Sequence, residues 1–157
     1  MTAKLNNFIV LTCLAPNWVR IFAVFLFASS IAIAGEGLPL LRGGKSDYTI
    51  VISQGATESE KYAAEEFQRF FAEASGQKLE ISSNPGKKEN LIFIGNSPEL
   101  SQVMPELKLI LLEAEESVVA TKGSSLILAG GPGRGTLYAV YSFLDEFMGC
   151  RWYSSDS

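Results

Sequence analysis

A glycine-rich loop at residues 130–135 is the segment whose spacing comes closest to ligand chemistry. It lies between an expected strand and an expected helix, where phosphate loops lie because a helix N-terminus favours anions. The triphosphate pattern requires Gly-x4-Gly-Lys-Ser/Thr, but Thr136 follows Gly135 directly and the lysine is missing. The dinucleotide pattern requires its third glycine one position later. We therefore interpret the loop as a tight strand-to-helix turn, and a nucleotide-binding protein is a distant alternative.

Acidic pairs are the second candidate for chemistry. They are Glu65-Glu66, Glu115-Glu116 and Asp145-Glu146. Hydrolysis of a glycoside needs two carboxyl groups about 5 to 10 Å apart across the sugar, one of them with a raised pKa. Neighbouring helix residues point in different directions, so neither pair in a helix forms such a site by itself. We expect the acids at 58, 65, 66 and 73 to form a solvated helix face.

Asp145 and Glu146 are expected in the last turn of a helix, where the helix dipole disfavours negative charge. Such an exception can mark an interface or a functional site. An ion pair between these acids and Arg151 is the simpler explanation, and we prefer it because ion pairs at helix ends are common.

The chain has no histidine, which excludes a catalytic triad with histidine, a histidine general base and an imidazole metal site. Cys150 is expected to be a small buried residue. Trp152 and Tyr153 could form a platform for a sugar, but aromatic rings are equally common in packing, which we prefer. The sequence therefore predicts no catalytic residue, no cofactor and no metal ligand.

Five expected strands and two main helices position these residues. The strands are predicted at 48–53, 78–82, 91–94, 117–121 and 126–129. Thr57 begins the first helix with Glu60 as its capping-box partner, and Gly76 ends it. A short helix is expected near Ser97, and Gly149 ends the second main helix. The second main helix carries an apolar stripe of Leu137, Val140, Tyr141, Leu144 and Phe147.

This order predicts an α/β (α+β two-layer) fold. We expect a small, mostly antiparallel or mixed β-sheet with the two main helices packed on one face.

Residues 1–34 read as a signal peptide. Their two charges, Lys4 and Arg20, are basic, an uncharged apolar run follows Arg20, and Ala32-Ile33-Ala34 fits a cleavage site before Gly35. A membrane anchor is the alternative, but it needs roughly 20 unbroken apolar residues. We therefore expect a secreted or periplasmic protein.

The charge of the remaining residues argues against two classes of partner. The whole chain carries −4, and removing two basic residues leaves −6 on residues 35–157. Nucleic acids and anionic membranes require concentrated basic charge. We expect neither as a partner once the signal peptide is cleaved.

Residues 126–153 resemble the end of the non-catalytic N-terminal domain of bacterial α-glucuronidases (glycoside hydrolase family 67). Similar domains precede the barrel of β-hexosaminidases. The likeness rests on a strand, a turn with Arg134-Gly135, a helix beginning Leu137-Tyr138-Ala139, and Gly149-x-Arg151-Trp152. Upstream, residues 60–71 resemble the first helix of that domain and residues 90–95 one of its strands.

After the signal peptide at 1–34 and a lead-in at 35–47, the resemblance implies an accessory domain at 48–157. A (β/α)8 barrel with the catalytic carboxylates would follow, and this sequence does not contain it. The expected function is non-catalytic support of a secreted, α-glucuronidase-like hydrolase in xylan-type breakdown. A free-standing secreted glycan-binding module is the alternative. We expect Arg134, Tyr138 and Trp152 to face the barrel.

Overall fold

The structure is a computed structural model that describes residues 37–151. The predicted signal peptide and the aromatic pair Trp152-Tyr153 lie outside this range. The elements are β1 (Thr49–Val51), α2 (Glu58–Ser75), β2 (Glu80–Ser82), β3 (Leu91–Ile94), α3 (Pro98–Val103), the 3-10 helix η1 (Leu109–Leu111), β4 (Ser117–Lys122), β5 (Ser125–Gly130) and α4 (Gly135–Met148).

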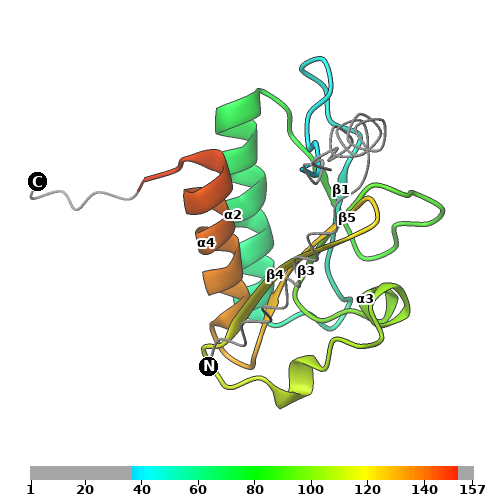
Figure 1. The fold of residues 1–157 in the computed structure, drawn as a ribbon, viewed down its shortest axis with the longest axis vertical. Coiled ribbons are helices and arrows are strands. Elements are labelled where there is room, and N and C mark those ends of the chain that lie inside the picture. The colour runs from blue at the N-terminus through cyan, green and yellow to red at the C-terminus, as the bar shows by residue number, and fades with distance from the viewer. Residues whose placement is uncertain (1–36, 152–157) are drawn as a thin grey trace, which may run out of the picture. The chain divides into compact units, whose positions relative to one another are not determined.

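The five strands form one mixed sheet in the order β2-β1-β3-β5-β4. Figure 1 shows α2 and α4 together on one side of this sheet. β1 is parallel to both β2 and β3, and β3 is parallel to β5. β4 and β5 form the one antiparallel pair in this sheet, joined at Lys122 and Ser125. The prediction of a mixed sheet is confirmed, and the strands predicted at 117–121 and 126–129 form this hairpin.

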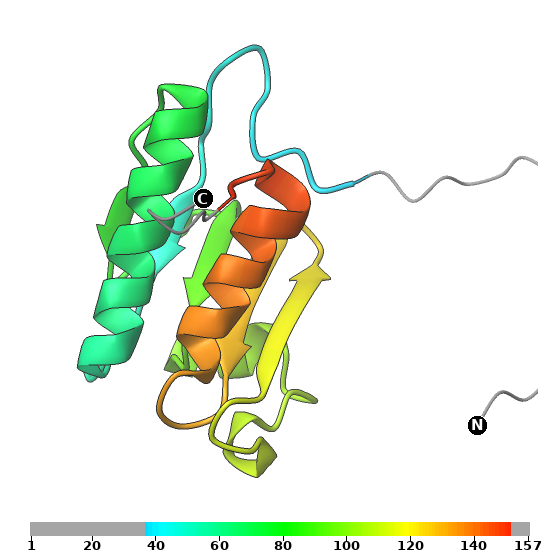
Figure 2. The same cartoon turned by 90° about the vertical axis from the view of Figure 1, so that its left-hand side faces the viewer.

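The two faces of the sheet are covered differently. α2 and α4 lie side by side on one face (Figure 2), where they bury Ile50, Ile92 and Leu128. On the opposite face, Phe93 and Ile127 pack with residues of α3 and η1. Because β3 and β5 are buried on both faces, their sequences are continuous apolar runs instead of alternating ones.

α2 begins and ends as the sequence predicts. The Thr57 hydroxyl accepts a hydrogen bond from the Glu60 amide (3.2 Å), and the Glu60 carboxylate accepts one from the Thr57 amide (2.8 Å). At the other end, Gly76 takes a left-handed conformation (φ +72°) and its amide donates to the Ala72 carbonyl. This conformation favours glycine, which explains why the helix ends there.

The stripe predicted on α4 is wrong at its last position. Val140 and Leu144 are buried, but Phe147 is 65% exposed. Phe143 instead makes the contact with α2, with its ring centroid 5.8 Å from that of Phe67. Phe147, one turn later, stacks on Phe143 at 5.2 Å. It therefore covers the end of the core without being enclosed by it.

Candidate functional site

The glycines of the β5–α4 loop are explained by close packing of the chain. The Gly131 amide donates to the Glu116 carbonyl (2.8 Å), and a Cβ at Gly131 would overlap the Glu113 carbonyl oxygen. Gly130 and Gly135 approach each other closely enough that a Cβ on Gly130 would overlap the backbone of Gly135. The expected tight turn is confirmed. The neighbouring turn carries Glu113, Glu115 and Glu116, whose charges disfavour an anion at this place.

The N-terminus of α2 already holds a carboxylate of the chain itself. Glu60 accepts hydrogen bonds from the Thr57 amide and hydroxyl (2.8 and 3.0 Å) and from the Asn96 amide (3.0 Å). Gly95, with φ +80°, lies so close that a Cβ there would overlap the Glu60 side chain. Glu60 therefore links α2 to the turn after β3. The sequence predicted its capping role but held no signal for the contact with Asn96.

Two adjoining hollows lie at the carboxyl ends of β2, β1 and β3. One, of about 590 Å³, is bordered by Lys61 and Glu65 of α2, and the other, of about 360 Å³, by Pro98 and Glu99 of α3. Both hollows are lined by Ser53, Gln54 and Ser83. We call the two together the carboxyl-edge crevice.

A polar cluster joins the two main helices. Glu66 is only 7% exposed, pairs with Arg69 (2.7 Å) and accepts a hydrogen bond from the Tyr141 hydroxyl (2.8 Å). Burial, followed by the hydrogen bond to Glu66, raises the pKa of Tyr141 well above the ordinary tyrosine value.

The prediction that Glu66 belongs to a solvated face is therefore wrong. Glu66 lies three residues after the buried Ala63 in the same helix. This helical spacing was the available signal that its side chain would be turned inward.

Of the two acids near the end of α4, Asp145 forms the expected contact. Arg151 donates to the Asp145 carboxylate at 2.6 Å, which confirms the predicted ion pair. The pair places positive charge beside the C-terminus of the helix, where the dipole favours it. Cys150 is half-buried at the margin of the core, and its amide donates to the Leu144 carbonyl (3.0 Å).

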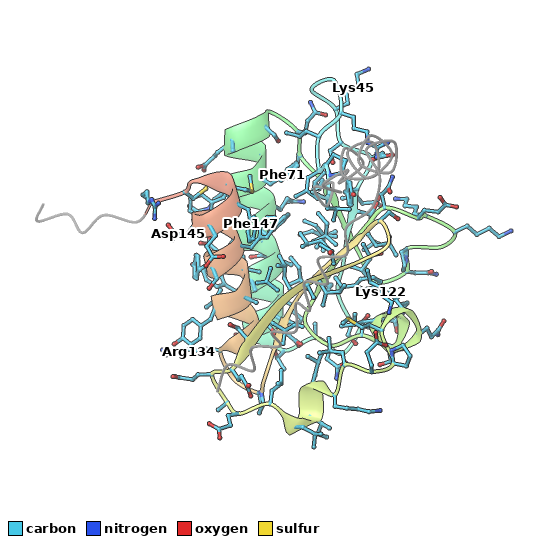
Figure 3. All side chains as sticks on the ribbon, in the orientation of Figure 1. Lys45, Phe71, Lys122, Arg134, Asp145 and Phe147 are labelled. Atoms are coloured by element: carbon cyan, nitrogen blue, oxygen red, sulfur yellow. The ribbon has the colours of Figure 1, made fainter. Side chains whose placement is uncertain are left out.

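Two of the three residues predicted to face a second domain lie within the described range. Arg134 is exposed at the start of α4, while Asp145 and Phe147 lie near its end (Figure 3). Tyr138 is half-buried, and Trp152 lies outside the described range. The structure adds exposed apolar residues that the sequence did not predict: Ile110 is 90% exposed and Leu111 77% exposed, both in η1.

Within residues 37–151, no group of three or more cysteine, aspartate or glutamate side chains is arranged to hold a metal ion. None of the helices formed by these residues is long and apolar enough to cross a membrane.

Comparison with solved structures gives a distant likeness. No family model matches the sequence, and no curated protein matches it. The solved structure of a GH138 enzyme targeting pectin rhamnogalacturonan II is similar, with a TM-score of 0.42 and 16% identity. The match covers 65% of this chain and 13% of that enzyme, so the chain spans a small part of its length. This distant similarity to part of a glycoside hydrolase does not indicate the α-glucuronidase family in particular.

Proposed function

We propose that this chain is the non-catalytic N-terminal accessory domain of an exported glycoside hydrolase of the α-glucuronidase type, acting on xylan-type polysaccharide. The observation that carries the proposal is the exposure of large apolar side chains at Ile110, Leu111 and Phe147 on a domain whose core is otherwise closed. The adjacent residues Ile110 and Leu111 in η1 are a candidate interaction site, because exposed apolar residues that lie together mark such sites. A following (β/α)8 barrel is the partner that the sequence resemblance implies.

Three acids that hold structural hydrogen bonds or ion pairs support a non-catalytic domain. Glu60 caps α2, Glu66 is tied to Tyr141 and Arg69, and Asp145 is paired with Arg151. A general acid for glycoside hydrolysis needs a carboxyl group that is free to give its proton to the leaving oxygen. These three carboxylates are held by structural contacts instead.

A free-standing glycan-binding module remains the alternative. A flat platform on a strand face would require exposed aromatic residues there. Across β1 to β5 the one aromatic residue is Phe93, which is fully buried. The strand faces of the domain therefore do not favour this alternative.

Activity measurements test the proposal. The purified chain should hydrolyse neither aryl glycosides nor glucuronoxylan fragments, whereas the native polypeptide that contains it should hydrolyse at least one of them. Turnover by this chain that persists through repeated purification would show that its acids are catalytic.

The interface is tested with Trp152→Ala. This change should leave the melting temperature of the chain almost unchanged and lower that of the native polypeptide, because a buried large aromatic side chain contributes about 1.5 to 3 kcal/mol. A large loss of stability in the chain alone would place Trp152 in its own core and remove it from the interface.

A further inference from the structure

The topology of the sheet singles out one edge of the domain. β1 and β3 are adjacent and parallel, yet the chain leaves β1 through α2 on one face and leaves β3 through α3 on the opposite face. The two connections diverge, with α2 and α3 on opposite sides of the strands (Figure 1). In open α/β sheets, ligands bind at this kind of switch point.

The carboxyl-edge crevice lies beside this position, over the carboxyl ends of β1 and β2 and bordered by α2 and α3. Its two parts, of about 590 and 360 Å³, meet at Ser53, Gln54 and Ser83, which follow β1 and β2. Small-ligand sites commonly have volumes of about 300 to 1,000 Å³, so the crevice has room for a sugar unit. Ile52 and Ile81, both half-buried, supply an apolar wall.

The charges at this edge exclude an anionic ligand. Beside the start of α2, the Glu60 carboxylate already accepts the backbone amides of Thr57 and Asn96, so a negative charge of the chain itself lies there. Lys61, the cation that borders the crevice, is paired with Glu58 at 2.8 Å. The carboxylates of Glu65 and Glu99 also border it and would repel a phosphate or a uronic acid.

The remaining polar groups are suited to hydroxyl ligands. The side chains of Gln54 and Ser83 make no hydrogen bond to any residue in the described range, and Gln54 is exposed. The Ser53 hydroxyl accepts a bond from the Gly55 amide (3.2 Å), which leaves its proton to donate. Amide and hydroxyl side chains both donate and accept, as a ligand with many hydroxyl groups requires.

We propose that the carboxyl-edge crevice binds a neutral saccharide unit through Gln54, Ser53 and Ser83. This goes beyond the proposed function, because it gives the domain a direct contact with carbohydrate that needs no catalytic partner. The ligand is neutral because Glu65 and Glu99 border the crevice and Lys61 is already paired with Glu58. Without an exposed aromatic platform, the affinity should be weak, with dissociation constants on the order of millimolar.

The test is a titration of the purified protein followed by the NMR shifts of its backbone amides. Xylobiose, galactose and rhamnose are each added alone, with glucuronic acid and inorganic phosphate as anionic probes. At least one neutral sugar should cause saturable shifts at residues 53, 54 and 83. The anionic probes should bind at least about tenfold more weakly, or about 1.4 kcal/mol.

Gln54→Ala and Ser83→Ala should each weaken that binding by at least about threefold while the circular dichroism spectrum stays unchanged. Gln77→Ala is the matched control, because Gln77 follows α2 at the opposite edge and contacts only the Gly76 carbonyl through its side-chain amide. Absence of shifts with all three sugars, shifts confined to other residues, or equal binding of phosphate would each overturn the proposal. None of these results bears on the size or activity of the native polypeptide. Those two properties test the proposed function separately.

Discussion

At the scale of single residues, the hydrogen bond between Glu66 and Tyr141 joins α2 to α4. A buried carboxylate is costly unless its charge is compensated. Glu66 meets this requirement with the Arg69 guanidinium on one oxygen and the Tyr141 hydroxyl on the other. Because the hydroxyl comes from the neighbouring helix, the contact also fixes how the two helices pack.

Tyr141→Phe should lower the free energy of unfolding by about 1 to 2 kcal/mol, because the hydrogen bond to a charged group is lost. Urea unfolding near neutral pH measures the change. The variant removes only the tyrosine hydroxyl and leaves the contacts of Gln68 and Ser75 in α2 unchanged. An unchanged urea midpoint would mean that the hydrogen bond does not hold the two helices together.

The same tyrosine predicts a dependence on alkaline pH. Its pKa is raised in the folded protein, whereas the pKa in the unfolded chain lies near the ordinary tyrosine value of 10.0. The stabilising effect is thus complete below pH 10 and is lost as the pH rises above it. The wild type should lose more stability above pH 10 than Tyr141→Phe does. The comparison is needed because burial also raises the pKa of Tyr48, which is present in both proteins. Parallel curves for the two proteins would contradict the contact.

Gly131→Ala tests the packing explanation of the glycine loop. The added methyl group would overlap the Glu113 carbonyl oxygen, so we expect a loss of about 1 to 3 kcal/mol in urea unfolding. Gly55→Ala is the control, because its methyl group would meet only the Ser53 hydroxyl at 3.9 Å and its backbone is not left-handed. Equal effects of the two substitutions would mean that the loop has room for side chains.

At the scale of the elements, α4 separates residues that hold the core from one that lies at its margin. Phe143→Ala should cost about 3 kcal/mol, because Phe143 is 7% exposed and packs against Phe67. Phe147→Ala should cost less than about 1 kcal/mol in this chain. Thermal or urea unfolding of both variants measures the two losses of stability. A loss for Phe147→Ala as large as that for Phe143→Ala would mean that Phe147 belongs to the buried stripe after all.

Local signals in the sequence were sufficient for the boundaries of the main helices. The Thr57–Glu60 capping box marks the start of α2 and Gly76 marks its end, and both were predicted. The contacts that depend on distant segments could not be predicted in the same way. The Glu60–Asn96 bond and the parallel pairing of β1 with β3 depend on how the sheet assembles, which no short pattern encodes.

The carboxyl-edge crevice could not be predicted from short sequence patterns either. Ser53, Gln54 and Ser83 are ordinary turn residues in the sequence, and nothing in their spacing brings them together. They meet because β1 and β2 are parallel neighbours whose carboxyl ends share an edge. The apolar stripe on α4 was predictable up to Leu144, but the position where the core ends was not.

At the scale of the whole molecule, we infer that a closed α/β core presents exposed apolar residues to a partner. The core cluster under α2 and α4 and the smaller cluster under α3 and η1 enclose both faces of the sheet. Ile110, Leu111 and Phe147 remain outside them. A second domain of the same polypeptide is the partner that we propose.

The size of the native protein tests this claim most directly. An antibody raised against this domain, used on exported protein from the native source, should detect a polypeptide that begins at Gly35 and exceeds this chain by at least a barrel, about 250 residues. Mass spectrometry of the captured protein gives both its N-terminus and its mass. A native exported product that ends near Ser157 and carries no further domain would contradict the account.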